Sequence, residues 1–135
     1  MDKLQGSCSC GQWQVRIKVG KPISELIPRI CDCDYCKSNP SAIVSDPSMK
    51  IELDGGKAIF DQNGDRQAKF YRCEKCNELL AVGCIIEGKL RGAVNSNLFC
   101  DTYAFSDPLQ IQPWKLTSIQ RMERWSKLWG LLSGV

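Results

Sequence analysis

Cysteine places the strongest constraint on how this sequence can fold. Its 135 residues include nine cysteines and no histidine. An odd number of thiols cannot pair completely within one chain, and Cys8 and Cys10 stand too close together to form a relaxed disulfide with each other. The lack of histidine excludes Ser-His-Asp triads, Cys-His pairs and HExxH metalloprotease sites. Any catalysis must therefore use a thiolate, a carboxylate, a metal ion or the backbone.

Most of the cysteines are grouped with the spacing of zinc knuckles. Seven of the nine fall into three short clusters: Cys8 and Cys10, then Cys31, Cys33 and Cys36, then Cys73 and Cys76. Zinc binds thiolates in tetrahedral groups of four, so these seven cysteines divide into a set of four and a set of three. A four-cysteine site is closed and structural, whereas three protein ligands leave one position for water or substrate. The sequence therefore predicts two zinc ions per chain, one structural and one with an open position.

The spacing also favours one division of the ligands. Cys31, Cys33 and Cys36 offer three donors on one tight loop, which makes them the candidate catalytic site with the open zinc. The first and last clusters would then join an early strand to a later one across more than sixty residues. Alternatively, Cys84 or Cys100 completes the second tetrahedron, although the apolar run around Cys84 is typical of a small buried hydrophobe. An iron–sulfur cluster is the competing metal group, but its usual four-cysteine spacings are absent.

Composition and hydropathy describe a folded chain in water. Hydrophobic residues make up 43% of the sequence and charged residues 24%, close to globular averages. The length fits a single domain over residues 1–135. No window approaches the roughly 20 apolar residues of a membrane span, and residues 1–6 lack the apolar core of a signal peptide. We therefore expect a cytoplasmic protein without a membrane partner.

Periodicity predicts short strands separated by turns. Apolar and polar residues alternate over 13–19 and again over 49–54, which is typical of half-buried strands. Glycine-containing turns follow at 54–56, 63–64 and 87–88. Residues 58–60, 70–72 and the apolar run 79–86 complete the expected strands. The predicted fold class is therefore mainly β.

Only the end of the chain has helical periodicity. After Thr117 or Ser118 as a possible N-cap, apolar residues recur at steps of three and four as far as Leu132, which predicts an amphipathic helix over about 117–132. Trp125 and Trp129 would dock this helix on the sheet. A helix that binds a membrane surface or a partner protein is the alternative.

Three motifs together resemble a known family. Gly6-Ser7-Cys8-Ser9-Cys10-Gly11, Cys31-x-Cys33-x-x-Cys36-Lys37 and Phe70-Tyr71-Arg72-Cys73-x-x-Cys76 resemble the glutathione-dependent formaldehyde-activating enzymes, or CENP-V/GFA domain. The resemblance extends to about residue 82, and residues 94–135 are diverged. It implies several small coiled antiparallel sheets stapled by zinc knuckles. It also implies a structural zinc and a zinc offered to a thiol substrate, with the ligand sets Cys8, Cys10, Cys73 and Cys76 for the first and Cys31, Cys33 and Cys36 for the second.

Two residues depart from the family pattern. Asp32 stands where the family commonly has histidine, and Asn77 stands where it usually has glycine. Asparagine tolerates the left-handed backbone that glycine supplies, so we expect the knuckle before Asn77 to fold normally.

The resemblance implies an activity like that of S-(hydroxymethyl)glutathione synthase, a carbon–sulfur lyase. The open zinc would activate a thiol, glutathione or a similar molecule, for addition to a small aldehyde such as formaldehyde. Arg29, Lys37 and Arg72 lie near the clusters in sequence and are candidates for binding substrate carboxylates. The rival class is a noncatalytic zinc-binding module that contacts a protein or nucleic acid. Seven ionised ligands and two zinc ions would cancel the formal charge of +3, which argues against nucleic acid.

Overall fold

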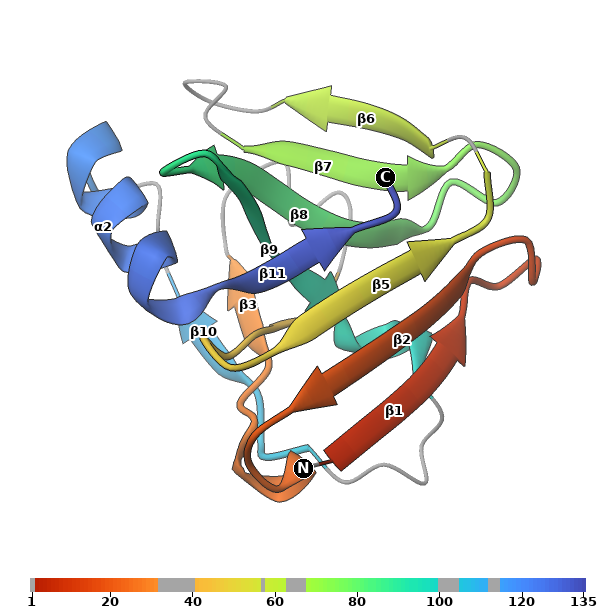
Figure 1. The fold of residues 1–135 in the computed structure, drawn as a ribbon, viewed down its shortest axis with the longest axis horizontal. Coiled ribbons are helices and arrows are strands. Elements are labelled where there is room, and N and C mark those ends of the chain that lie inside the picture. Colours follow the sequence, from red (N-terminus) through yellow and green to blue (C-terminus); the bar gives the residue numbers. More distant parts are fainter. Residues whose placement is uncertain (1, 32–40, 57, 63–67, 100–104, 112–114) are drawn as a thin grey trace.

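The computed structural model of the chain describes residues 2–31, 41–56, 58–62, 68–99, 105–111 and 115–135 (Figure 1). These residues form strands, two short 3-10 turns and one α-helix. The strands are β1 (Asp2–Ser7), β2 (Gln14–Val19), β3 (Arg29–Cys31), β4 (Ile43–Val44), β5 (Lys50–Asp54), β6 (Ala58–Gln62), β7 (Lys69–Cys73), β8 (Leu79–Ile86), β9 (Lys89–Asn95), β10 (Leu109–Ile111) and β11 (Gly130–Ser133). The 3-10 turns are η1 (Ile23–Glu25) and η2 (Ser96–Leu98), and the helix is α2 (Ser118–Leu128). The predicted class, mainly β with a C-terminal helix, is confirmed.

The strands join in one mixed sheet that branches at β9. The main order is β1-β2-β5-β11-β9-β4-β3-β10, and a second branch runs from β9 through β8 and β7 to β6. Most pairs are antiparallel, but β10 pairs with β3, and β11 with β5, in the parallel direction. The sheet is therefore mixed, whereas only antiparallel pairing was expected. β11 and β4 share one edge of β9, while β8 pairs along the other. The sheet curls, so that β6, β7 and β8 lie above the layer of β11, β5, β2 and β1 (Figure 1).

The predicted alternation of apolar and polar residues determines which side chains of β2 and β5 enter the core. Residues of β2 and β5 are buried at every second position, which brings Val15, Ile17 and Ile51 inside. Trp13 is also fully buried and packs directly over Gly55 in the turn after β5. The expected turn between β8 and β9 is present, with positive φ angles at Glu87 (53°) and Gly88 (78°), as a tight hairpin requires.

The C-terminal helix is shorter than the sequence predicts. It begins after Thr117, whose side chain accepts a hydrogen bond from the Gln120 N–H in a capping box, and it ends at Leu128 rather than near 132. Residues 130–133 instead form β11, between β5 and β9, and Leu132 is buried there. Two strand partners outweigh the helical spacing because they satisfy the backbone on both sides of β11.

The helix docks on the sheet through its tryptophans, as predicted. Trp125 and Trp129 stack with ring centroids 4.5 Å apart, and Trp129 is 7% exposed. Both pack against an apolar group from β8 and β9 that includes Val82 and Ala93. In the part of the chain that the structure describes, no helix is long and apolar enough to cross a membrane.

One buried carboxylate lies in the loop before β5. Asp46 is 7% exposed, forms an ion pair with Lys21 (Nζ to Oδ1, 2.8 Å) and accepts hydrogen bonds from the backbone and hydroxyl of Ser48. Burial alone would raise the pKa of Asp46, but the hydrogen bonds from Lys21 and Ser48 outweigh it and lower the pKa below its usual value.

Candidate metal centre

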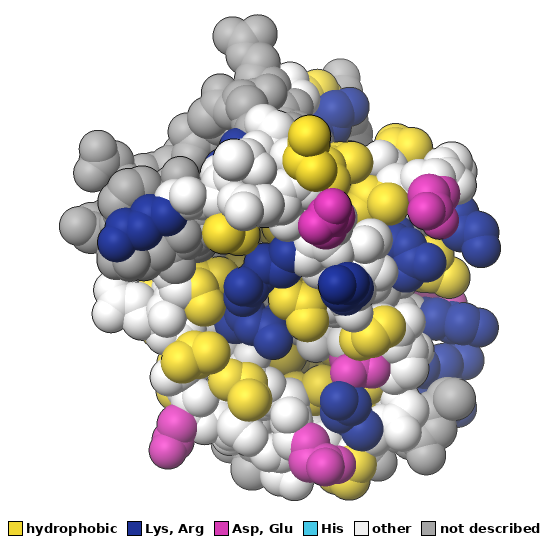
Figure 2. All heavy atoms as spheres, turned by 90° about the vertical axis from the view of Figure 1, so that its left-hand side faces the viewer, with side chains coloured by type: hydrophobic (Ala, Val, Ile, Leu, Met, Phe, Trp, Pro, Cys, Tyr) yellow, Lys and Arg dark blue, Asp and Glu magenta, His cyan; other side chains and the backbone are white. Residues whose placement is uncertain are grey.

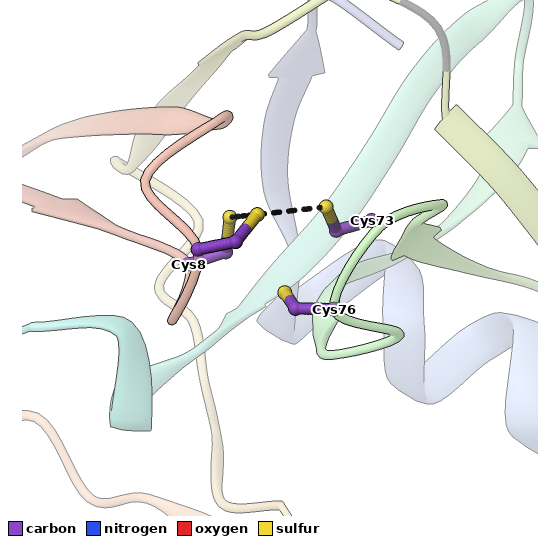
Figure 3. Close-up of side chains that lie close together, drawn as sticks. Cys8, Cys73 and Cys76 are labelled. Carbon is purple, nitrogen blue, oxygen red and sulfur yellow. Dashed lines mark hydrogen bonds between the residues drawn. The ribbon is translucent and has the colours of Figure 1, made fainter.

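Two turns from distant parts of the chain bring four cysteines together. Cys8 and Cys10 lie in the turn between β1 and β2, and Cys73 and Cys76 lie where β7 turns into β8. Their sulfur atoms all lie within 4.8 Å of one another. Figure 3 shows the thiols of the two turns pointing toward one another across the gap between the turns.

The distances fit a metal site better than disulfides. The Sγ atoms of Cys8 and Cys10 are 3.5 Å apart, and those of Cys10 and Cys73 are 3.6 Å apart. A disulfide would need about 2.05 Å. A zinc ion with four sulfur ligands at about 2.3 Å makes a tetrahedron whose edges are about 3.8 Å. The four free thiols could therefore hold a metal ion, and soft sulfur donors suit zinc.

The first turn is shaped by its own backbone. The Gly11 N–H donates to the Cys8 carbonyl (2.9 Å), and the Cys8 N–H donates to the Trp13 carbonyl (3.2 Å). Gly11 has a φ of 79°, which glycine adopts without a steric cost. The Trp13 N–H then donates to the Cys8 sulfur (3.4 Å). Cys8 is buried and Cys10 is exposed, so the two thiols lie at the boundary between the core and the surface.

The second turn confirms the expectation for Asn77. Its φ is 61°, in the left-handed region, and its N–H donates to the Cys73 carbonyl (2.9 Å). The Cys73 N–H donates to the Glu78 carbonyl (3.1 Å). The knuckle therefore closes with asparagine in the left-handed position.

A carboxylate ties the two turns together. Oε1 of Glu78, just after the second turn, accepts hydrogen bonds from the Ser9 N–H (2.7 Å) and the Ser9 hydroxyl (3.0 Å) in the first. The residues are 69 positions apart. Sequence reasoning missed this pair, since Ser9 is only a spacer between two ligands in the first motif and Glu78 lies outside the motifs.

Arg72 stabilises the second turn through hydrogen bonds. Its Nε donates to Oδ2 of Asp61 (3.0 Å) and its guanidinium to the Asn77 carbonyl (3.1 Å), and it is 4% exposed. The suggestion that Arg72 binds a substrate carboxylate is therefore wrong, because the residue is buried and fully engaged within the fold.

The pKa values of Cys10 and Cys76 are shifted in opposite directions. The Gln12 N–H lowers the pKa of Cys10, but desolvation and the thiols of its three neighbours outweigh it and raise the pKa to about 11. Burial raises the pKa of Cys76, but the backbone N–H groups of Glu78 and Cys10, together with nearby thiols, lower it to about 7. One sulfur therefore ionises near neutral pH, and a cation that binds the group would displace the remaining protons.

The other predicted site residues are described only in part. Cys31 ends β3, and Cys33, Cys36 and Cys100 lie outside the described residues. The open zinc site therefore stays a prediction. Cys84 packs in the apolar group under α2, 3.7 Å from Sδ of Met122, and burial raises its pKa, as expected of a small hydrophobe. Asp32 and Lys37 also fall outside the described segments.

The comparisons with known proteins add information on the fold. No protein-family model matches the sequence, and no curated protein gives a significant match. The structure is similar to the crystal structure of a Rhodobacter sphaeroides protein solved by a structural genomics programme. The TM-score is 0.55 at 16% sequence identity, and the match covers 77% of this chain and 99% of that one. At this identity the likeness shows a shared fold and nothing about activity.

Proposed function

We propose that Cys8, Cys10, Cys73 and Cys76 hold a structural zinc ion. The observation that carries this proposal is the convergence of four sulfur atoms within 4.8 Å. Four protein ligands leave no coordination position for a substrate, so the site joins two turns and does not react. Its role is to tie the β1–β2 turn to the end of β7 across 63 residues of sequence.

We propose that the chain acts as an enzyme through the other cluster. Cys31, Cys33 and Cys36 would hold a second zinc with an open position, in a carbon–sulfur lyase of the glutathione-dependent formaldehyde-activating type. The support is the three-cysteine spacing in the sequence and the resemblance of all three motifs to that family. A cytoplasmic location fits the proposal, because a reducing compartment keeps such thiols available for metal.

The proposed reaction needs no histidine base. Bound zinc supplies positive charge that favours the thiolate over the thiol of a substrate such as glutathione. The substrate thiolate forms a carbon–sulfur bond with the carbonyl carbon of a small aldehyde such as formaldehyde. The carbonyl electron pair moves to oxygen, which takes up the proton that the thiol released. The product is an S-hydroxymethyl adduct, and the reverse reaction breaks the same bond.

Metal analysis tests the two sites separately. Purified wild-type protein is expected to contain close to two zinc ions per chain, and Cys36→Ser close to one. If Cys36→Ser and the wild type both contain a single zinc, the open site and the lyase proposal fail while the structural site stands. If Cys73→Ser keeps the same zinc content as the wild type, the structural site itself is refuted.

An activity assay separates the enzyme from the noncatalytic module. Exchange between glutathione, labelled formaldehyde and their adduct is followed by NMR, with and without protein. Acceleration by the wild type and its loss in Cys36→Ser support the lyase. Equal exchange rates with and without the metal-loaded wild type favour the module, in which both zinc ions only hold the fold.

A further inference from the structure

The outer face of β1, β2 and β5 carries a row of three lysines. Lys3 of β1 lies directly opposite Lys18 of β2, and Lys18 lies directly opposite Lys50 of β5. All three side chains are exposed. Neighbouring strands are about 4.8 Å apart, so the row spans roughly 10 Å. Residues directly opposite on neighbouring strands point to the same face of a sheet, so the three ammonium groups lie together on this face.

The lysine row is unfavourable for the free protein. Like charges directly opposite each other on neighbouring strands destabilise a sheet. In the part of the chain that the structure describes, none of the three lysines forms an ion pair. The next row along the same strands does contain one, between Arg16 and Glu52 (Nε to Oε2, 3.8 Å). A bound anion would therefore remove a repulsion that the described residues leave in place.

A pocket of about 340 Å³ lies over the lysine row. Its lining includes the three lysines, Gln5, and the ion-paired Arg16 and Glu52. Four basic side chains and one acidic side chain give this lining a net charge of +3. Pockets of roughly 300–1,000 Å³ suit small molecules. None of the described lining residues is aromatic, so the pocket offers no stacking platform for nucleic-acid bases.

The pocket is separate from the candidate metal centre. Lys3 lies near the start of β1, whereas the cysteine turn follows Ser7 at the end of the strand, roughly 13 Å further along. The excess of positive charge disappears in this direction. Arg16 is paired with Glu52, and the exposed Asp54 lies at the end of β5 nearest the turn. Positive charge is therefore concentrated at the end of the face away from the cysteines.

Basic side chains also occur on another side of the molecule. On the side that carries α2, Lys and Arg side chains gather near the centre of the face with hydrophobic side chains around them (Figure 2). Positive charge alone therefore does not distinguish the lysine row. Its register across three adjacent strands and the pocket over it do. Lys127, which is exposed on α2, supplies a matched control.

We propose that Lys3, Lys18 and Lys50 form a binding site for a small molecule with two phosphate groups. Each phosphate ester carries a charge of about −1.5 to −2 at pH 7, so two of them complement the net charge of the pocket. Lysine ammonium groups are compact point charges with rotatable donors, which suit the tetrahedral oxygens of phosphate, whereas the planar arginine fork suits a carboxylate. The length of the row favours two phosphate groups over one, because the outer lysines then bind without bending toward the middle one.

Fructose 1,6-bisphosphate is the probe for this site. Fructose 6-phosphate is the matched monophosphate, and tricarballylate is a small anion with three carboxylates. Calorimetry at low salt gives the affinities, and NMR shifts of the lysine side chains locate the ligand. We expect the bisphosphate to bind more tightly than the other two probes, with an affinity that falls as salt is added. Lys18→Gln should weaken its binding roughly fivefold, whereas Lys127→Gln should bind it as the wild type does.

The outcomes decide for or against the assignment. A preference for the bisphosphate that depends on the lysines supports it. Equal affinity for all three probes would show an unspecific cationic surface, and binding that is absent or unchanged in Lys18→Gln would overturn the site. A short single-stranded oligonucleotide that binds more tightly than the bisphosphate, with the same lysine dependence, would overturn the small-molecule assignment. The bisphosphate has no thiol, so none of these results depends on the lyase proposal.

Thermal stability gives a second readout. Lys18→Glu places an acid between two lysines and creates favourable cross-strand pairs. The melting temperature of the free protein should therefore rise by about 2–4 °C while bisphosphate binding is lost. The bisphosphate should raise the melting temperature of the wild type and leave that of Lys18→Glu unchanged. A lower melting temperature in Lys18→Glu than in the wild type would show that Lys18 stabilises the fold, and the inference would be withdrawn.

Discussion

Removal of the proposed structural zinc should cost a large share of the stability of this fold. The closest ligands from the two turns, Cys10 and Cys73, are 63 residues apart. A cross-link that closes a loop of this length removes about 4 kcal/mol of chain entropy from the unfolded state, taking the relation for disulfides as a guide. Typical domains are stable by only about 5–15 kcal/mol. For 135 residues the unfolding entropy is roughly 280 cal/mol/K, so the melting temperature should fall by about 15 °C.

The assay is a thermal melt followed by circular dichroism. Wild-type protein is compared with Cys73→Ser, each at full zinc loading and after removal of the metal by a chelator. Chelation should lower the melting temperature of the wild type by the predicted amount, while the melt of Cys73→Ser should change little. Cys84→Ala is the matched control, because it removes a thiol that lies outside the four-sulfur group. A wild-type shift under about 3 °C would refute the loop-closure reasoning.

Three further predictions concern residues around the site and the sheet. Glu78→Gln replaces the charged acceptor of two Ser9 hydrogen bonds, so the interaction between the two turns should weaken by about 1 kcal/mol. A chelator should then extract zinc several-fold faster from this variant in a competition assay. The lowered pKa of Asp46 means that its contribution is present above pH ~4 and lost as pH falls through the folded value. The difference in unfolding free energy between wild type and Asp46→Asn, measured in urea, should therefore shrink from pH 6 to pH 3, and an unchanged difference would contradict the assignment. Gly130→Ala places a methyl group against the Met49 carbonyl and should destabilise β11 by about 3 kcal/mol in denaturant melts, whereas no change would show that the strand can shift.

The parts of the fold that the sequence predicted are those with a strong local pattern. Alternation over 13–19 and 49–54 appears as β2 and β5, and the apolar run 79–86 is β8 residue for residue. The short strands β3, β4 and β10 were not predicted, because two or three residues carry no periodicity. β1 was missed for another reason: Asp2–Ser7 is polar apart from Leu4, and it is a strand because β2 offers a partner.

The candidate metal centre was predictable because its ligands are a chemical signature. Counting thiols with the tetrahedral preference of zinc predicts a set of four, the spacing of the clusters selects which four, and these cysteines do converge. The contacts around it were not predictable. Ser9 and Glu78 are polar residues with many possible partners, and only the three-dimensional fold selects this pair. The end of the helix was mispredicted because Leu132 continues a helical spacing while its backbone is used by two strands.

The position of β11 has a consequence for the order in which the molecule assembles during synthesis. The strand comes from residues 130–133, yet it fills the seam between β5 and β9. Until the ribosome releases these residues, β5 and β9 each keep one bare edge, and bare edges attract strands from other chains. During synthesis this seam therefore stays unpaired until residues 130–133 have left the ribosome and can add β11 between β5 and β9.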